Sequence, residues 1–229
     1  MNLSFRLRKI IDFLDLPTKV ADIGTDHAYI PIYLANHTEC SVIIASDHNQ
    51  APYQAAVNHV QSAGVSDKID LRLGSGLSVL DVGEVDAVII AGMGGTTIKE
   101  ILADNYELAQ NLEQLILQPM AGAASLRNWL VDNKFEIADE GLVKGSKKQQ
   151  LYQILSIKPG AMEIEDDFLL ELGPKLIANK DRLLREHLND LEKNWQQIID
   201  EIALNAPQHP KIKKLEQKIV KLQEVKEWL

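Results

Sequence analysis

Short apolar segments alternate with amphipathic ones along the first two thirds of the chain. The apolar segments predict seven strands, the last two as a closing antiparallel pair: residues 20–23, 42–46, 69–73, 86–91, 115–118, 135–142 and 150–157. Helices are predicted between the first six strands, except between the third and the fourth, which a short segment connects. An N-terminal helix is predicted over residues 3–14, ending before Pro17, and we expect it to pack beside the first strand. Strands that alternate with helices predict an α/β fold, a mostly parallel sheet covered on both faces.

The pattern changes after Pro159 and Gly160. From Pro174 onward, apolar residues keep a spacing of four and three that is typical of a coiled-coil seam, and a second seam follows a break at residues 205–210. The seams are formed by Ile177, Leu184, Leu188, Leu191, Trp195, Ile198 and Ile202, and by Ile212, Leu215, Ile219, Leu222 and Leu229. We therefore expect two domains: residues 1–160 form the α/β domain, and residues 161–229 form a C-terminal α-helical hairpin, an antiparallel coiled coil.

Composition narrows the class of protein. Hydrophobic residues make up 45% and charged residues 25% of the 229 residues, which is close to the average for soluble globular proteins. The single Cys40 excludes an internal disulfide and a cysteine metal cluster, and no His spacing indicates a metal site. Because we find neither a secretory signal nor a membrane-spanning run, we expect a cytoplasmic protein without membrane association. The net charge of -9 argues against indiscriminate binding to nucleic acid but leaves local basic patches open.

The candidate ligand-binding residues directly follow the predicted strands. In an open α/β sheet, ligands bind outside the carboxyl ends of the parallel strands. The candidate cofactor contacts at these ends are Asp22, Gly24, Thr25, His27, Asp47, His48, Gly74, Ser75, Gly76, Leu77, Ala91, Gly92 and Met93. Asp26 and Gln118 belong to the same edge of the sheet.

The first strand end favours a nucleoside ligand that carries no phosphates. Gly24 stands alone where a dinucleotide-binding turn has G-x-G-x-x-G, so a pyrophosphate would lack its cradle. Asp47 ends the second predicted strand, where a carboxylate can accept hydrogen bonds from a ribose diol, although a helix cap before Asn49 explains Asp47 equally well on its own. S-adenosylmethionine is such a nucleoside ligand. Asp22 or Asp26 would engage its ammonium group.

Four runs of residues resemble the bacterial tRNA (adenine(22)-N1)-methyltransferase family: residues 22–31, 51–56, 90–95 and 115–119. The predicted hairpin is similar to the C-terminal part of that family. The resemblance implies a class I methyltransferase with a Rossmann-like, seven-stranded sheet, S-adenosylmethionine as methyl donor, and N1 of an adenine in the tRNA D-arm as acceptor. One departure is Met120, which stands where the family has Asn, so no role of that side chain carries over.

Methylation of adenine N1 needs alignment more than proton transfer, because N1 has an available lone pair at neutral pH. The product ring carries a positive charge. We predict that Asp26 stabilises this charge, while binding of the cofactor is an equally good role for it. Tyr29 and His27 would stack on the base or donate hydrogen bonds to it, and Gln118 would contact it through its amide. The alternatives are core packing for Tyr29, a helix cap for His27 and a structural bond at the sheet edge for Gln118.

The target N1 lies on the Watson-Crick edge, so the adenine must be extruded and the surrounding RNA held. Candidate phosphate contacts form three basic clusters: Arg6, Arg8 and Lys9; Lys144, Lys147 and Lys148; and Lys211, Lys213 and Lys214. We expect tRNA as the partner and see no sign of an obligate protein partner. The hairpin would clamp tRNA, mediate self-association or brace the sheet. A methyltransferase of another RNA, of DNA or of a small molecule, and a non-catalytic nucleoside-binding sensor, remain alternatives.

Overall fold

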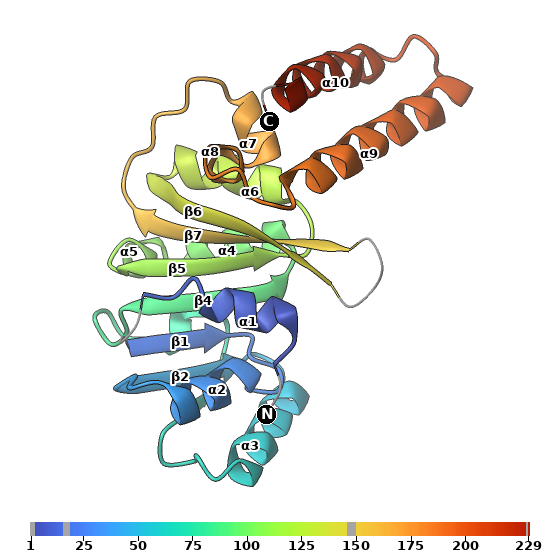
Figure 1. Ribbon diagram of the computed structural model, residues 1–229. Helices are drawn as coiled ribbons and strands as arrows, with labels where there is room; N and C mark the ends of the chain where they lie inside the picture. The colour runs from blue at the N-terminus through green and yellow to red at the C-terminus, as the bar shows by residue number, and fades with distance from the viewer. Residues whose placement is uncertain (1–2, 16–18, 146–149, 228) are drawn as a thin grey trace.

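The computed structural model describes residues 3–15, 19–145, 150–227 and 229 (Figure 1). Its seven-stranded sheet has the order β3-β2-β1-β4-β5-β7-β6; β7 pairs antiparallel with both β5 and β6, and all other pairs are parallel. The strands are β1 Lys19–Ile23, β2 Val42–Asp47, β3 Asp70–Leu73, β4 Ala87–Met93, β5 Gln114–Pro119, β6 Phe135–Lys144 and β7 Leu151–Pro159. This confirms the predicted Rossmann-like, mostly parallel sheet and its closing antiparallel pair.

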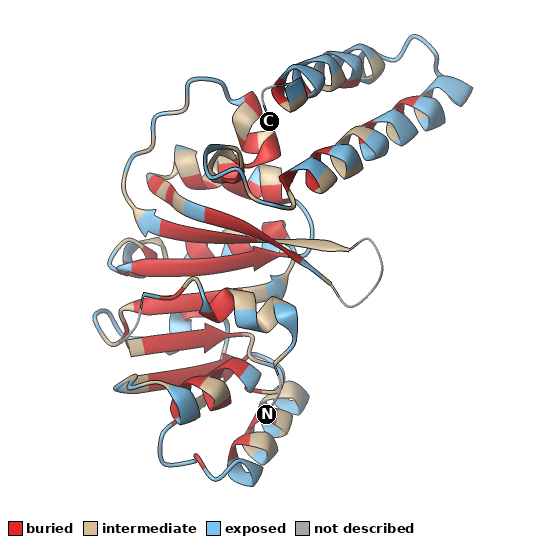
Figure 2. Cartoon of the chain, viewed as in Figure 1, coloured by how far each residue is buried: buried red, intermediate tan, exposed pale blue. Residues whose placement is uncertain are grey.

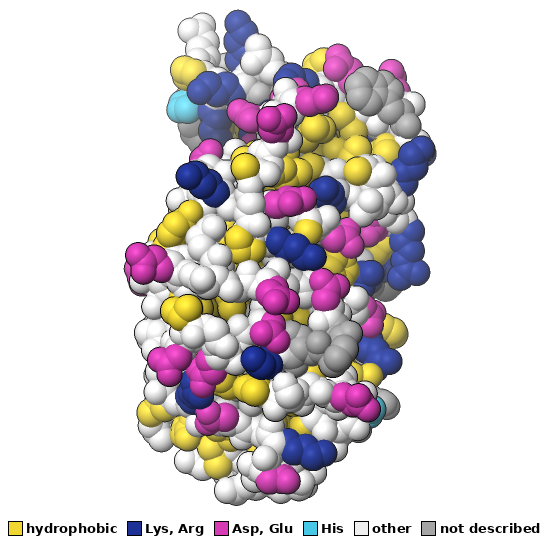
Figure 3. Space-filling view, turned by 90° about the vertical axis from the view of Figure 1, so that its left-hand side faces the viewer, with side chains coloured by type: hydrophobic (Ala, Val, Ile, Leu, Met, Phe, Trp, Pro, Cys, Tyr) yellow, Lys and Arg dark blue, Asp and Glu magenta, His cyan; other side chains and the backbone are white. Residues whose placement is uncertain are grey.

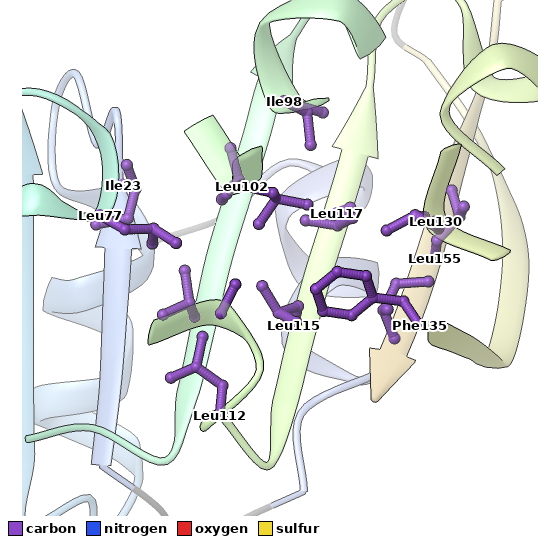
Figure 4. Packing of buried hydrophobic residues seen from close by; sticks show 14 of the residues in the cluster. Ile23, Leu77, Ile98, Leu102, Leu112, Leu115, Leu117, Leu130, Phe135 and Leu155 are labelled. Atoms are coloured by element: carbon purple, nitrogen blue, oxygen red, sulfur yellow. The ribbon is translucent and has the colours of Figure 1, made fainter. Parts of the chain in front are cut away.

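Helices cover the sheet on both faces because its central strands are apolar on both sides. Along β4, Ala87 and Ile89 face the helices α1, α2 and α3, while Val88 and Ile90 face α4, α5 and α6. The helices of these two layers are α1 Phe5–Ile11, α2 Tyr29–His37, α3 Gln50–Ser62, α4 Gly95–Asp104, α5 Tyr106–Ala109 and α6 Ala123–Asp132. Figure 4 shows the core between the sheet and the layer of α4, α5 and α6. A strand that is buried on both faces requires a continuous apolar run.

Helix α1 is shorter than predicted. It packs chiefly against β6, β7 and α2, and its Ile10 and Ile11 share a core cluster with Val20 of β1. Its N-cap Ser4 accepts a hydrogen bond from the backbone N–H of Leu7 at 3.3 Å. The helix runs opposite to β1 and β4, so its first turn reaches the carboxyl ends of the parallel strands (Figure 1).

The C-terminal segment forms α7 Phe168–Leu172, α8 Pro174–Ala178, α9 Leu184–Asn205 and α10 Pro210–Glu227. Pro174 begins a helix as predicted, but the prediction of one continuous helix from this residue is wrong. The chain turns after α8, where Lys180 has a φ of 49° and an Asp181 carboxylate oxygen accepts the backbone N–H of Leu142 at 3.1 Å. Beyond the turn, α9 and α10 pack side by side and confirm the helical hairpin. Its regular coiled-coil geometry stays a prediction.

A buried ion pair between α6 and β6 anchors the segment that precedes the hairpin. Arg127 of α6 and Glu140 of β6 are each about 1% exposed and lie 2.6 Å apart. The other Glu140 oxygen accepts the backbone N–H of Lys175, and Leu170 packs within the core of the sheet. The distal ends of α9 and α10 are exposed (Figure 2). A domain boundary between residues 160 and 161 therefore stays a prediction.

Candidate active site

A cavity of about 530 Å³ opens at the carboxyl ends of β1 and β4, the edge at which the sequence placed a ligand. It gathers eight of the predicted cofactor-binding and catalytic residues: Asp22, Gly24, Thr25, Asp26, His27, Tyr29, Ala91 and Gly92. The first turn of α1 closes it with Leu3, Ser4, Arg6 and Leu7. Residues far apart in the sequence thus form one site.

A second cavity of about 220 Å³ adjoins the first and shares Gly24 with it. It is bordered by further predicted cofactor contacts: His48, Gly74, Ser75, Gly76 and Met93. The thioether of Met93 lies over Gly24, where an added Cβ would be 2.1 Å from the Met93 methyl carbon. Gly24 also has a φ of 75°, so any side chain here would be both strained and crowded.

The loop between β1 and α2 holds an unusual backbone conformation. Asp26 and Ala28 have φ values of 50° and 53°, which side-chain-bearing residues rarely adopt. The backbone N–H groups of Gly24 and Thr25 both donate to the Ser46 carbonyl at 2.8 Å and fix the loop to β2. Backbone strain of this kind costs about 1–3 kcal/mol per residue and concentrates at functional sites.

Asp22 is a buried carboxyl group at the end of β1, 6% exposed. It accepts a hydrogen bond from the Thr25 hydroxyl at 2.6 Å. Burial raises the pKa of Asp22 from 3.8 to about 6, while the Thr25 bond and the nearby Arg6 oppose the shift. At neutral pH the group is therefore a desolvated anion, which a cationic group of a ligand would stabilise.

His27 and Tyr29, which line the first cavity, form an aromatic triangle with His59. The ring centroids lie 5.4 Å apart for His27 and Tyr29, 5.0 Å for His27 and His59, and 5.6 Å for Tyr29 and His59. The Asp26 side chain beside it is 65% exposed, and its carboxylate lies 3.6 Å from Nε2 of His27. His59 was not among the predicted site residues, because only the packing of α3 against the β1–α2 loop brings it next to His27.

Three predicted site residues have structural contacts that the sequence did not settle. One Asp47 carboxylate oxygen accepts the backbone N–H of Asn49 at 2.8 Å, and because Asn49 itself is the N-cap residue of α3, this bond orders the turn before the helix and does not cap it. Leu77 is fully buried in the core and lines neither cavity. Gln118 is also fully buried, and its amide oxygen accepts a hydrogen bond from Nη1 of Arg6 at 2.5 Å.

Several residues of the basic clusters already have intramolecular contacts. Arg8 donates to the Tyr33 hydroxyl, Lys9 lies above the Phe13 ring, and Lys144 pairs with Glu186 of α9 at 2.7 Å. Exposed on the first turns of α10 are Lys211, Lys213 and Lys214, whereas Lys147 and Lys148 lie outside the described residues. On the face at the amino ends of the parallel strands, acidic and basic side chains are interspersed (Figure 3).

Within residues 3–15, 19–145, 150–227 and 229, no group of three or more His, Cys, Asp or Glu side chains is placed to hold a metal ion. In the same part of the chain, no helix combines the length and apolar character that crossing a membrane demands.

Comparison with known proteins gives matches along nearly the whole chain. The family model described as tRNA (adenine(22)-N(1))-methyltransferase, TrmK, matches residues 20–224. A Bacillus subtilis (strain 168) protein described as tRNA (adenine(22)-N(1))-methyltransferase is 30% identical, with 99% of this chain and 97% of that protein covered. Its crystal structure has a TM-score of 0.86 to this chain at 98% coverage of both.

Two streptococcal structures are also similar. A Streptococcus agalactiae protein of the NADB-Rossmann superfamily has a TM-score of 0.89 and 32% identity, covering 98% of this chain and 97% of that one. A Streptococcus pneumoniae putative tRNA (m1A22) methyltransferase, in complex with S-adenosyl-L-methionine, has a TM-score of 0.86 and 30% identity, covering 98% of this chain and 99% of that one.

Proposed function

The chain belongs to the tRNA (adenine(22)-N(1))-methyltransferase family, and on this basis we propose that it transfers a methyl group from S-adenosylmethionine to N1 of adenine 22 in tRNA. The structural observation that carries the proposal is the cavity at the ends of β1 and β4, which combines a glycine turn, a buried carboxylate and an aromatic wall. With tRNA as its partner, the protein would act in the cytoplasm.

The residues of the two cavities fit the cofactor. Gly24 borders both cavities without a side chain, so a ligand can approach its backbone, and Asp22 offers a buried anion to the ammonium group of the methionyl end. The second cavity, with His48 and Gly74–Gly76, lies at the ends of β2 and β3 and would take the adenosyl end. Asp47 would accept the ribose hydroxyls. When bound, S-adenosylmethionine supplies a methyl group on a positively charged sulfur, open to attack by a lone pair.

The aromatic triangle of His27, Tyr29 and His59 would hold the acceptor base. Flat rings can stack an extruded adenine, and stacking on aromatic side chains contributes roughly 1–3 kcal/mol per base. Tyr29 is 39% exposed, so its ring is accessible from outside. The chain need not remove a proton from N1. Its task is to align the lone pair and to exclude water from the space between base and cofactor.

Asp26 is the group that would respond to the charge of the product. Methylation of N1 leaves a positive charge on the ring, and a carboxylate at the rim of the cavity stabilises that charge as it forms. The left-handed backbone at Asp26 and the bonds of its neighbours to Ser46 keep the carboxylate in position. This role for Asp26 and binding of the cofactor are distinguished by measuring rate and affinity separately.

The proposed function is tested with purified protein, methyl-labelled S-adenosylmethionine and unmodified tRNA, followed by digestion to nucleosides. We expect the label in 1-methyladenosine. Label in N6-methyladenosine would contradict the choice of N1, and cofactor binding without transfer would favour a nucleoside sensor. A tRNA with guanine in place of adenine 22 is the matched control, and it should accept no label.

A further inference from the structure

Phe5 is a large apolar side chain that stands in water beside the first cavity. It is 84% exposed, although both of its neighbours in the chain, Ser4 and Arg6, line the cavity. Arg6 turns inward, where its Nη1 donates to the buried amide oxygen of Gln118 at 2.5 Å, and the Phe5 ring is left outside. Single exposed apolar residues are common, so the exposure of Phe5 gains meaning only from its position at the rim of this site.

Helix α1 holds Phe5 in a fixed place. Ile10 and Ile11, on the last turn of the helix, are buried in the core of the α/β domain. Arg8 donates a hydrogen bond to the hydroxyl of Tyr33 and so ties α1 to α2. A ring carried by an anchored helix loses little conformational freedom when it contacts a ligand, which lowers the cost of binding.

The same face of α1 carries positive charge. Residues three and four positions apart share one face of a helix, which places Arg8 and Lys9 beside Phe5. The Arg8 side chain stays exposed even though it lies 4.0 Å from a carboxylate oxygen of Asp12. Surfaces that bind single-stranded nucleic acid combine aromatic rings, which stack on bases, with cations, which contact phosphates. The face around Phe5 therefore matches RNA better than the apolar surface of a protein.

Exposed apolar side chains from two further elements lie by the same cavity. Tyr29 of α2 lines it, and Met120 directly follows β5. The Met120 sulfur lies 3.6 Å from the amide nitrogen of Gln118, the residue that holds Arg6. The rim thus offers flat or flexible apolar groups on α1, on α2 and at the end of β5. Such a rim can receive the bases next to the one that enters the cavity.

We propose that Phe5 is a wedge that enters the tRNA base stack at the place that the extruded adenine leaves. The inference rests on the proposed function and names the residue that stabilises the extruded state. Extrusion costs the stacking and the pairing of the adenine. Apolar side chains that insert between base steps are a known way to offset such unstacking. Because Phe5 stands between two residues that line the cavity, its ring would meet the bases that flank the adenine.

Single-turnover methylation of two tRNA transcripts tests the wedge, with tRNA and S-adenosylmethionine both saturating. In one transcript adenine 22 stands opposite uridine, and in the other it stands opposite adenine and cannot pair. Phe5→Ala should slow methylation of the paired transcript roughly 10- to 100-fold, the range that stacking on one base supplies. The mismatched transcript should lose much less, because its adenine is extruded at lower cost. Phe5→Trp keeps a flat ring and should retain most of the rate on both.

Val82→Ala is the matched control. Val82 is also exposed, but it lies in the turn before β4, at the opposite edge of the sheet, so both rates should stay unchanged. Phe5→Ala should bind S-adenosylhomocysteine as the wild type does, because Phe5 lies outside both cavities. Ligand-free melting temperatures should agree among all variants, since the exchanged side chains are exposed.

Three results would overturn the wedge, and one concerns the function instead. Equal slowing of both transcripts in Phe5→Ala would assign Phe5 to general binding of RNA. Unchanged rates on both transcripts would leave Phe5 without a role in extrusion. Unchanged rates together with the loss of a dimer in sedimentation would assign it to a contact between two copies of the chain. Failure of the wild-type protein to methylate either transcript would instead contradict the proposed function.

Discussion

Replacing Asp22 with Asn should stabilise the ligand-free protein at neutral pH and weaken its binding of the cofactor. Burial raises the pKa of Asp22 from 3.8 to about 6. Since the folded-state pKa lies above the unfolded one, the associated stability is fully present below pH 3.8 and is lost as the pH rises through 6. The difference between the two pKa values, 6 - 3.8, corresponds to about 3 kcal/mol in the free energy of unfolding.

Asn removes the charge but keeps an oxygen that can accept the Thr25 hydroxyl. We therefore expect urea denaturation at pH 7.5 to show Asp22→Asn about 1–3 kcal/mol more stable than the wild type, the upper value being the full effect of the charge. At pH 5 the gain should fall to about half, because Asp22 is then largely protonated in the folded state. Affinity for S-adenosylhomocysteine should drop roughly tenfold or more, since a charge-assisted bond to the ammonium is lost.

The matched control is Asp26→Asn. The Asp26 side chain is 65% exposed, so the loss of its charge should change stability by less than about 0.5 kcal/mol. Lower stability of Asp22→Asn than of the wild type at pH 7.5 would refute the reasoning. So would an equal gain in both variants, because the gain would then come from net charge and not from desolvation.

Three further predictions concern the loop, the rim of the cavity and the hairpin. Gly24→Ala and Gly64→Ala should each lower the free energy of unfolding by about 1–2 kcal/mol, because both glycines have φ near 70°. Only Gly24→Ala should also weaken S-adenosylhomocysteine binding in a titration. Gly64 is the control, because nothing lies within 4 Å of a Cβ at that position. Equal affinities would show that the Gly24 position does not border the ligand. Asp26→Asn should lower the single-turnover rate roughly tenfold at saturating cofactor, and an unchanged rate would restrict Asp26 to cofactor binding. Replacing residues 196–214 with a short glycine-serine loop should weaken tRNA binding in a filter assay without changing cofactor affinity; unchanged tRNA affinity would limit the distal hairpin to other roles.

The sheet could be predicted because its signals are local. Apolar runs such as 87–90 are buried on both faces in the structure, and the glycines that follow them occupy the turns. The turn between α8 and α9 could not be predicted in this way. Ile177 and Leu184 are seven residues apart, which also fits an unbroken heptad, and the turn depends on the bond from Leu142 to Asp181.

The site residues that directly follow a strand could be predicted, whereas those that reach the site through the packing of helices could not. Asp22, Gly24 and Gly92 follow their strands directly and line the cavity as expected. Arg6 belongs to a short basic run that is typical of an exposed helix, and only the docking of α1 across the strand ends turns it inward. His59 joins His27 from α3 for the same reason.

The most direct test of the account is the position of the methyl group on tRNA. A tRNA transcript incubated with the protein and S-adenosylmethionine should block reverse transcription at adenine 22, because a methyl group on N1 prevents Watson-Crick pairing. A transcript with guanine at that position should be copied without a new stop. A stop at another nucleotide, or none despite bound cofactor, would contradict the central claim.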